Sequence, residues 1–339
     1  MRTANFKSAA IAALLSMGLL TGCTNGITNQ KTSNHMDTLN LTQEWDKKFP
    51  QSNKVNHRKV TFKNRYGITL AADLYEPKNI ESKVPAIAVS GPFGAVKEQS
   101  SGLYAQTMAE RGFLTLAFDP SYTGESGGEP RNVASPDINT EDFSAAVDFL
   151  IAHPNVDAKR IGIIGICGFG GMGLNAAAMD TRIKATVAST MYDMSRVNAN
   201  GYFDAEDSAE VRRNKREAMN AIRTRDAQNG TATPGTPGLP TSIKGDEPQF
   251  VKDYFDYYKT ERAFHARAIN SNGAWNPTMA LSFINMPLLT YIHEIDNAVL
   301  LIHGENAHSR YFSEDAFKRL RGNNKELLIV PGGSHTGLY

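Results

Sequence analysis

The chain has 339 residues, with 36 lysines and arginines against 35 aspartates and glutamates, so its formal net charge is +1. A balance this close to neutral gives no basic footprint for binding nucleic acid. With only two cysteines, Cys23 and Cys167, the chain is no disulfide-rich scaffold, and its length suits one large domain or a core with an inserted cap.

The first segment, residues 1–22, has the features of an export signal. Arg2 and Lys7 supply a positive start, an apolar run follows, and Thr21 and Gly22 are the small residues that a signal peptidase accepts. The apolar run is shorter than the roughly 20 residues that a bilayer-spanning helix needs. The segment therefore predicts a cleaved signal peptide rather than a membrane span.

The end of this segment, Leu-Thr-Gly-Cys at residues 20–23, resembles a bacterial lipobox. The resemblance implies cleavage before Cys23 and attachment of a lipid to its sulfur. We therefore expect an exported protein that is anchored to a bacterial membrane through Cys23 and faces the periplasm or the cell exterior. An ordinary signal peptide with an incidental cysteine is the alternative.

Residues 23–55 are rich in Asn, Thr, Gln, Ser and Lys and have few large apolar side chains. Such a composition buries too little surface to offset the entropy of ordering, so it predicts a flexible tether. Cleavage of residues 1–22 would remove two basic residues from the 36, so that 34 remain against 35 acidic ones. The mature protein therefore also gives no reason to expect a nucleic acid partner.

Short apolar runs recur along the rest of the chain, with segments of helical character between them. Alternating residues at 59–63 and 68–75 predict a leading antiparallel pair. The later runs are apolar throughout, which is typical of parallel strands buried on both faces by helices, and the alternation predicts the α/β class with a mostly parallel sheet. The expected strands are residues 85–90, 113–119, 160–166, 183–188, 298–303 and 326–330, and the expected helices are residues 103–111, 140–152, 171–179 and 313–321.

The segment between about residues 191 and 287 breaks this alternation. Residues 205–228 are highly charged and favour helix, and residues 229–240 are rich in Gly, Pro and Thr. Seven aromatic residues then occur between residues 250 and 275. We interpret the whole segment as a cap inserted into the sheet, whose aromatic side chains either pack it onto the core or form a wall for an apolar substrate.

Cys167 directly follows the apolar run 160–166 and stands among glycines, in Gly-Ile-Cys-Gly-Phe-Gly-Gly at residues 165–171. A strand that ends in a nucleophile and turns sharply into a helix is a nucleophile elbow. At the helix N-terminus, unpaired amides and the helix dipole stabilise a thiolate. The Gly168 amide would then bind a developing oxyanion, and the loop after the earlier strand offers Phe93 as the second donor.

Three loops together suggest a family. The cysteine motif at residues 165–171 resembles the elbow of dienelactone hydrolase and its relatives, which have the α/β-hydrolase fold. Residues 118–128 resemble the Asp/Gly/Ser loop after an earlier strand of that fold, and residues 330–339 match its late loop that carries the catalytic histidine. The resemblance implies an α/β-hydrolase domain over residues 56–339, with a cap insertion, in which His335 is the base.

Two positions depart from the family pattern. Phe169 stands two residues after Cys167, where a small residue is usual, and would alter the turn or fill part of the site. The resemblance also places an acid three residues after the glycine that ends the penultimate strand, but that position is Ala307. Glu305 is the nearest carboxylate and our first candidate, and Asp193, after the strand at 183–188, is the alternative that some relatives would use.

These residues predict a hydrolase of esters, lactones or thioesters that uses Cys167 and His335, acts on a small acyl substrate and needs no cofactor or metal. Two alternatives remain. Cys167 is a buried small hydrophobe in a non-catalytic binding lipoprotein that retains the fold. Otherwise Gly-Phe-Gly-Gly-Met-Gly at residues 168–173 is a dinucleotide fingerprint, which would make Cys167 dispensable.

Overall fold

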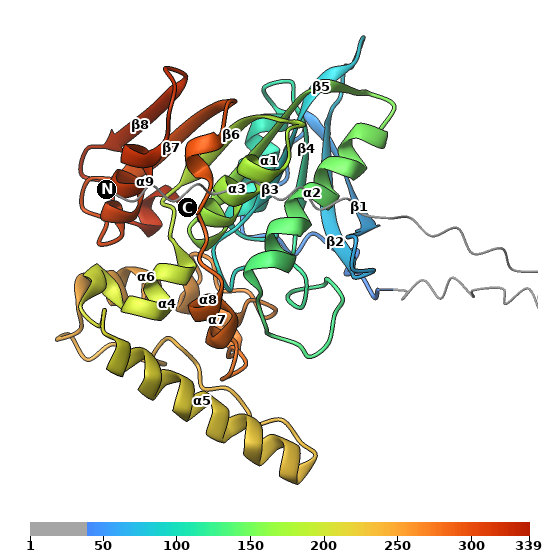
Figure 1. Cartoon of the computed structure of the whole chain (residues 1–339). Coiled ribbons are helices and arrows are strands. Elements are labelled where there is room, and N and C mark those ends of the chain that lie inside the picture. The colour runs from blue at the N-terminus through green and yellow to red at the C-terminus, as the bar shows by residue number, and fades with distance from the viewer. Residues whose placement is uncertain (1–38) are drawn as a thin grey trace, which may run out of the picture. The chain divides into compact units, whose positions relative to one another are not determined.

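A computed structural model describes residues 39–339. Its centre is an eight-stranded sheet with the strand order β1-β2-β4-β3-β5-β6-β7-β8, flanked by helices (Figure 1). The predicted signal peptide at 1–22 and the predicted lipid attachment at Cys23 lie outside the described residues and stay predictions.

The sheet is antiparallel only at its first edge. Strands β1 (Val55–Lys63) and β2 (Thr69–Pro77) form the predicted antiparallel pair, and β2 runs antiparallel to β4. Every expected apolar run is a strand, and each is parallel to its neighbours beyond β4, which confirms the mostly parallel sheet. These strands are β3 (Val84–Ser90), β4 (Leu114–Phe118), β5 (Val156–Ile166), β6 (Ile183–Ser189), β7 (Ala298–Gly304) and β8 (Lys325–Val330).

Four helices connect and cover the strands. α2 and α3 pack against each other over β5, whereas α1 packs on β3 and β4, and α9 on β7 and β8. Each begins three or four residues before its predicted start. For α1, α2 and α3 the first residue is Ser100, Pro136 or Gly168, residue types that are poor in a helix interior but acceptable in the first turn. The four helices are α1 (Ser100–Ala109), α2 (Pro136–Ala152), α3 (Gly168–Met179) and α9 (Arg310–Arg319).

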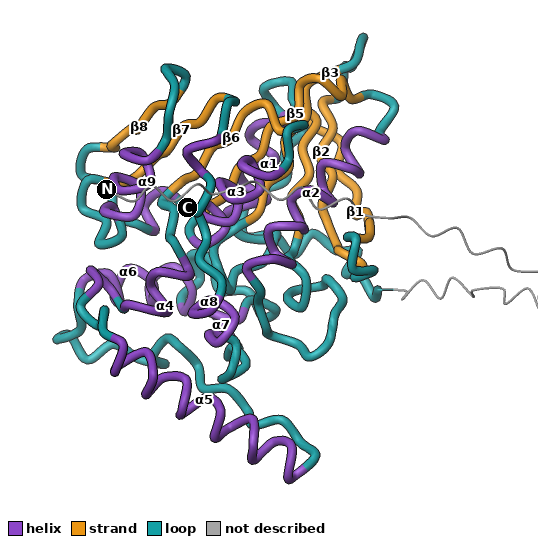
Figure 2. The backbone as a smooth tube through the Cα atoms, viewed as in Figure 1, coloured by secondary structure: helices purple, strands orange, loops and turns teal. Residues whose placement is uncertain are grey.

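Residues 190–297 contain no strand, and the segment predicted as a cap, about 191–287, lies within them. Figure 2 shows this region as helices joined by long loops, with the charged helix α5 at the margin farthest from the sheet. Ser208 caps the start of α5 through its side chain, and Gly230 ends it with a φ of 67°. The helices are α4 (Met194–Asn200), α5 (Ala209–Asn229), α6 (Gln249–Lys259), α7 (Ile269–Asn272) and α8 (Ala280–Asn285), with short 3-10 turns at Tyr202–Asp204 and Ile292–Glu294.

The described part of the predicted tether, residues 39–55, is not a free chain. Phe49 is buried against the core, and the indole of Trp45 donates a hydrogen bond to its carbonyl oxygen. Lys47 forms an ion pair with Asp73 in which both side chains are fully buried. Composition alone underestimated how far residues 39–55 pack on the domain, because a few well-placed side chains are enough to bind this segment to it. Among residues 39–339, no helix is both long and apolar enough to cross a bilayer.

Candidate active site

Cys167 lies at the turn between β5 and α3, in a backbone conformation that few residues adopt. Its φ is 56°, and its carbonyl oxygen accepts hydrogen bonds from the amides of Gly170 and Tyr192, which hold the turn from two sides. Glycine is required at Gly165, because a Cβ there would lie 2.1 Å from the carbonyl oxygen of Phe169. A positive φ such as that of Cys167 costs of order 1–3 kcal/mol in a residue other than glycine and is common at functional sites.

Two backbone amides, those of Phe93 and Gly168, donate hydrogen bonds to the Cys167 sulfur. The Phe93 peptide is held from the cap, because the Asn270 side chain donates to the Phe93 carbonyl oxygen at 2.8 Å and the Asn270 amide donates to Gly94 at 3.1 Å. The Phe93 ring stacks on Trp275 at 4.2 Å between centroids. The structure therefore brings together the three residues predicted to form the nucleophile and its two oxyanion donors.

Phe169 neither distorts the elbow nor fills the site. Its side chain is 3% exposed and its ring packs 6.2 Å from that of Phe143, in the core under α2 and α3. Phe169 does not line the cavity at Cys167. The residue two positions after the nucleophile therefore contributes its backbone to the turn and its side chain to the core, so a large residue is accommodated.

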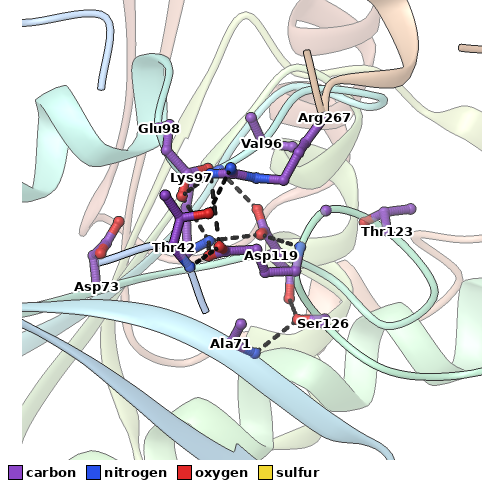
Figure 3. Close-up of polar contacts among 12 residues, drawn as sticks. Thr42, Ala71, Asp73, Val96, Lys97, Glu98, Asp119, Thr123, Ser126 and Arg267 are labelled. Atoms are coloured by element: carbon purple, nitrogen blue, oxygen red, sulfur yellow. Dashed lines mark hydrogen bonds and ion pairs between the residues drawn. The ribbon is translucent and has the colours of Figure 1, made fainter. Parts of the chain in front are cut away.

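The segment that follows Phe93 carries Lys97, which lies at the centre of a cluster of charged side chains (Figure 3). Lys97 is fully buried, and its ammonium lies 2.8 Å from Asp119, 2.6 Å from Glu125 and 2.8 Å from Glu98. Asp119 also accepts the Lys97 amide at 2.8 Å, which closes the loop onto the end of β4. Arg267 reaches the cluster from the cap, with 2.8 Å to Glu98. We call these five residues the ion cluster.

The ion cluster is stabilised by its own charges. Burial opposes ionisation of Glu125, but the ammonium groups of Lys97 and Lys59 outweigh it and lower the pKa of Glu125 to about 2. The pKa of Glu98 is likewise held well below its ordinary value by Lys97 and Arg267 despite burial. Buried charges of this kind are tolerated only when each has a close partner, so the cluster fixes the geometry of the Phe93 loop.

His335 lies on the loop after β8, buried beside the elbow. Its Nε2 atom is 2.8 Å from the hydroxyl of Tyr339, and Tyr339 also lies beside the Cys167 thiol, whose pKa it lowers. Among the described residues, no direct hydrogen bond between Cys167 and His335 is formed. The predicted nucleophile and base are therefore neighbours with one tyrosine hydroxyl between them.

Hydroxyl and imidazole groups occupy the other side of His335. Its Nδ1 atom is 2.6 Å from the hydroxyl of Ser309, which is 2.9 Å from His303 Nε2. His303 Nδ1 is in turn 2.7 Å from the hydroxyl of Ser313. Ser309 therefore stands where a triad would have its acid, and sequence reasoning missed it because only carboxylates were considered for that position.

Neither candidate acid contacts His335 in the described part of the chain. Glu305 is exposed, and its carboxylate accepts the amide of Gly332 at 2.8 Å, which ties the β7 loop to the β8 loop. Asp193 is buried at the start of α4, where its carboxylate accepts hydrogen bonds from the Arg196 amide and the Ser195 hydroxyl. Both carboxylates are thus engaged in holding loops, and neither orients the imidazole in this structure.

The site is neutral at rest. Burial raises the pKa of the Cys167 thiol, although hydrogen bonds from Tyr339, Phe93 and Gly168 partly offset this effect. Burial also lowers the pKa of His335 well below its ordinary value, and the nearby rings of His308 and His303 lower it further. At rest, Cys167 is therefore a thiol and His335 a neutral imidazole, rather than a thiolate and an imidazolium. The neutral imidazole can accept a proton.

A cavity of about 340 Å³ opens at Cys167 and is walled largely by the cap. In the described part of the chain, its lining has no carboxylate and no cationic side chain. Residues 39–339 also contain no group of three or more His, Cys, Asp or Glu arranged to hold a metal ion. The lining residues are Phe93, Cys167, Tyr192, Met194, Tyr202, Gly238, Leu239, Phe250, Val251, Tyr254, Tyr258, Asn270 and Tyr339.

Comparison with known proteins places this site in a family context. Residues 66–337 match the family described as X-Pro dipeptidyl-peptidase (S15 family). The uncharacterized protein PA2218 of Pseudomonas aeruginosa is 60% identical over 345 residues, covering 100% of this chain and 92% of its own. The uncharacterized protein YcjY of Escherichia coli is 34% identical over 295 residues, covering 84% and 92%. The thiohydrolase aneE of Aspergillus aculeatus is 33% identical over 132 residues, but covers only 39% of this chain and 41% of its own.

Solved structures agree on the fold. The crystal structure of PA2218 superposes with a TM-score of 0.86 at 64% identity, covering 89% of this chain and 94% of that one. The α/β hydrolase GrgF from Penicillium superposes with a TM-score of 0.65 at 21% identity, covering 83% and 91%, and that likeness shows the fold alone. The expected α/β-hydrolase fold is therefore confirmed, and the chain belongs to the family described as X-Pro dipeptidyl-peptidase (S15 family).

Proposed function

We propose that this protein is a cysteine hydrolase that cleaves an ester, lactone or thioester of a small apolar or aromatic acyl group. One observation carries the proposal: the Cys167 sulfur sits on a strained elbow, accepts hydrogen bonds from two backbone amides and faces a cavity lined by aromatic side chains. A cysteine that served only as a small core residue would need neither the strain nor the converging amides.

In the reaction, the Cys167 sulfur attacks the substrate carbonyl carbon and its proton moves toward His335. The carbonyl oxygen gains the negative charge, and the amides of Phe93 and Gly168 stabilise it where it forms. Collapse of this intermediate breaks the bond to the alcohol or thiol, which takes the proton from His335 as it leaves. Water then attacks the acyl-cysteine with His335 as its base, which releases the acid and restores the thiol.

The cavity lining supports an apolar acyl group. Tyr192, Tyr202, Phe250, Tyr254 and Tyr258 give it aromatic walls. Such a lining favours flat or branched apolar groups, with a few hydroxyls left to orient them. Thioesters are included because one partial relative is named as a thiohydrolase.

The family description suggests a second activity, release of X-Pro dipeptides. A dipeptidyl-peptidase must bind the free α-ammonium of its substrate, and a buried cation requires an opposite charge close by. Within residues 39–339 the cavity lining offers no carboxylate for this purpose. We therefore favour the ester and thioester reaction and retain the dipeptide reaction as an arm of the test.

The test is hydrolysis of p-nitrophenyl esters of graded acyl size, matching thioesters and an X-Pro p-nitroanilide, by wild type and Cys167→Ala. We expect wild type to cleave aromatic or medium acyl esters or thioesters and the variant to lose all turnover. Mass spectrometry of the quenched wild type should find the acyl group on the Cys167 peptide.

Equal turnover by Cys167→Ala would contradict the proposed nucleophile. Cleavage of the X-Pro p-nitroanilide alone would support release of X-Pro dipeptides in place of the ester and thioester reaction. No turnover and no acyl adduct with any substrate would favour the alternative, a non-catalytic binding lipoprotein that retains the fold.

We also propose that the enzyme acts at a membrane surface through a lipid on Cys23, which rests on the lipobox-like residues 20–23. Cells that express the full chain should incorporate labelled palmitate into this protein, and Cys23→Ser should abolish the label and release the protein to the soluble fraction. Equal labelling of both proteins would contradict the anchor.

A further inference from the structure

Tyr339 holds a central position that the proposed reaction has not yet used. Its hydroxyl is 2.8 Å from His335 Nε2, and Tyr339 also lies beside the Cys167 thiol, whose pKa it lowers, so its hydroxyl stands between the proposed nucleophile and base. Tyr339 also lines the cavity at Cys167. A hydroxyl is both a donor and an acceptor, so it can receive one proton and release another without becoming charged.

The surroundings of Tyr339 hold this hydroxyl in place. Its ring packs edge-on against Tyr257 at 4.9 Å and Tyr258 at 6.4 Å between centroids. The preceding carbonyl, that of Leu338, accepts a hydrogen bond of 2.7 Å from the Tyr104 hydroxyl. Arg262 donates to the carbonyl of Thr336 at 2.8 Å, which ties the same segment to the cap. Contacts from three directions thus fix the ring between nucleophile and base.

The hydrogen bonds around His335 can be ordered in one direction. With both imidazoles neutral, each ring carries one N–H. When His335 Nε2 accepts from Tyr339, its Nδ1–H donates to Ser309, the Ser309 hydroxyl donates to His303 Nε2, and His303 Nδ1–H donates to Ser313. This leaves the Tyr339 oxygen free to accept from the Cys167 thiol.

We propose that the Tyr339 hydroxyl is a catalytic group that carries the thiol proton from Cys167 to His335. As the sulfur electron pair forms the bond to the carbonyl carbon, the thiol proton passes to the Tyr339 oxygen. The original Tyr339 proton passes at the same time to His335 Nε2, and the carbonyl electron pair moves onto its oxygen. The reverse transfer delivers the proton to the leaving group, so no net charge remains on the tyrosine.

Burial favours this neutral relay. It raises the pKa of Tyr339 well above its ordinary value, and the nearby Cys167 raises it further. A tyrosinate is therefore not a stable resting form, and Tyr339 keeps its hydroxyl proton before and after the transfer. The alternative role for Tyr339 is that of a plug, which would exclude substrate and slow the reaction.

The experiment compares wild type, Tyr339→Phe and Tyr339→Ala, and it rests on the proposed hydrolase activity. Pre-steady-state release of p-nitrophenol gives the acylation rate, and iodoacetamide labelling of Cys167 against pH gives a readout that needs no turnover. We expect Tyr339→Phe to lower the acylation rate by about 100-fold, within the range for lost acid–base catalysis, with KM changed less than about threefold. Its labelling profile should shift to more alkaline pH, because the thiolate loses a hydrogen bond.

Tyr257→Phe is the matched control. Its ring also contacts Tyr339, but its hydroxyl lies beside Ser100 and it does not line the cavity. We expect this variant to acylate within about twofold of wild type, and a loss as large as that of Tyr339→Phe would overturn the assignment to Tyr339. A thermal unfolding curve for each variant separates loss of the fold from loss of the relay.

Three further results would overturn the proposal. These are Tyr339→Phe acylation at the wild-type rate, an unshifted labelling profile, and faster acylation by Tyr339→Ala, which would assign the plug. Failure of the hydrolase function is recognised separately, since Cys167→Ala would then turn over as wild type does. An inactive Cys167→Ala with an unaffected Tyr339→Phe refutes only the relay.

Discussion

The two sides of the site are held by opposite kinds of chemistry. On the oxyanion side, the loop that carries Phe93 is fixed by the ion cluster, in which the buried Lys97 and the partly exposed Arg267 meet three carboxylates. On the base side, His335 is surrounded by hydroxyls and imidazoles, and no carboxylate among the described residues contacts it.

This difference matches what each side has to do. In the proposed reaction the oxyanion donors must stay in place while charge develops, and buried ion pairs with several partners are geometrically demanding and therefore rigid. The proposed base, His335, must gain and lose a proton, and burial lowers its pKa so that it is unprotonated at rest. The cost is that nothing anionic stabilises the imidazolium, so the proton is expected to remain there only briefly.

The largest effect should come from breaking the ion cluster. Lys97→Met leaves Asp119, Glu98 and Glu125 buried without their central cation, and we expect about 3–5 kcal/mol less free energy of unfolding. Urea unfolding measures it. Arg213→Met is the control, because the Arg213–Glu217 pair is exposed and should leave stability near the wild-type value. Equal stability of both variants would contradict a central role for Lys97.

The base side should instead be sensitive to acid. Burial lowers the pKa of His308 to about 4, so below about pH 6.5 the unfolded chain binds a proton at this imidazole that the folded chain does not. Stability therefore falls as the pH drops, by about 1.4 kcal/mol per unit or about 2 kcal/mol between pH 6.5 and 5.

His308→Gln tests this sensitivity, since glutamine keeps a polar group but does not titrate. Urea unfolding of wild type and variant at pH 7 and pH 5 should show a smaller acid loss in the variant, by about 2 kcal/mol. If the variant lost the same free energy on acidification as wild type, His308 would not be the group that titrates.

The smallest effect separates Ser309 from Glu305. Ser309→Ala removes the partner of His335 Nδ1 and should lower kcat about tenfold, or about 1.4 kcal/mol, with little change in KM because the imidazole loses its orientation rather than the substrate its contacts. Glu305→Gln should change kcat by less than about twofold, since its carboxylate contacts Gly332. Steady-state kinetics on the best ester checks both, and the reverse result would restore Glu305 as the orienting acid.

Several residues of the candidate site could be predicted from the sequence. Cys167 could be placed because an apolar strand, flanking glycines and a following helix are all local features. Gly168 followed from the elbow, as the residue after the nucleophile, and Phe93 from the loop after an earlier strand, since parallel strands end at one edge of a sheet. His335 followed from the resemblance of residues 330–339 to the late loop of the α/β-hydrolase fold. Their catalytic roles remain predictions.

The acid position could not be read in the same way. Glu305 and Ser309 both follow β7, four residues apart, and the path of that loop decides which side chain reaches His335. The loop turns Glu305 toward the Gly332 amide and brings Ser309 to the imidazole. A search restricted to carboxylates was therefore certain to miss the hydroxyl.

The sequence by itself determined the fold class, the elbow and the order of the functional loops, because apolar periodicity, glycine positions and strand order act over short distances. Only the tertiary structure decided the partners of His335 and the contents of the ion cluster. There Thr42 donates to Glu125 across 83 residues, and Arg267 reaches Glu98 from the cap. Such contacts depend on where folded loops meet, and hydrogen bonds and ion pairs form between whichever suitable groups come within about 3 Å of each other.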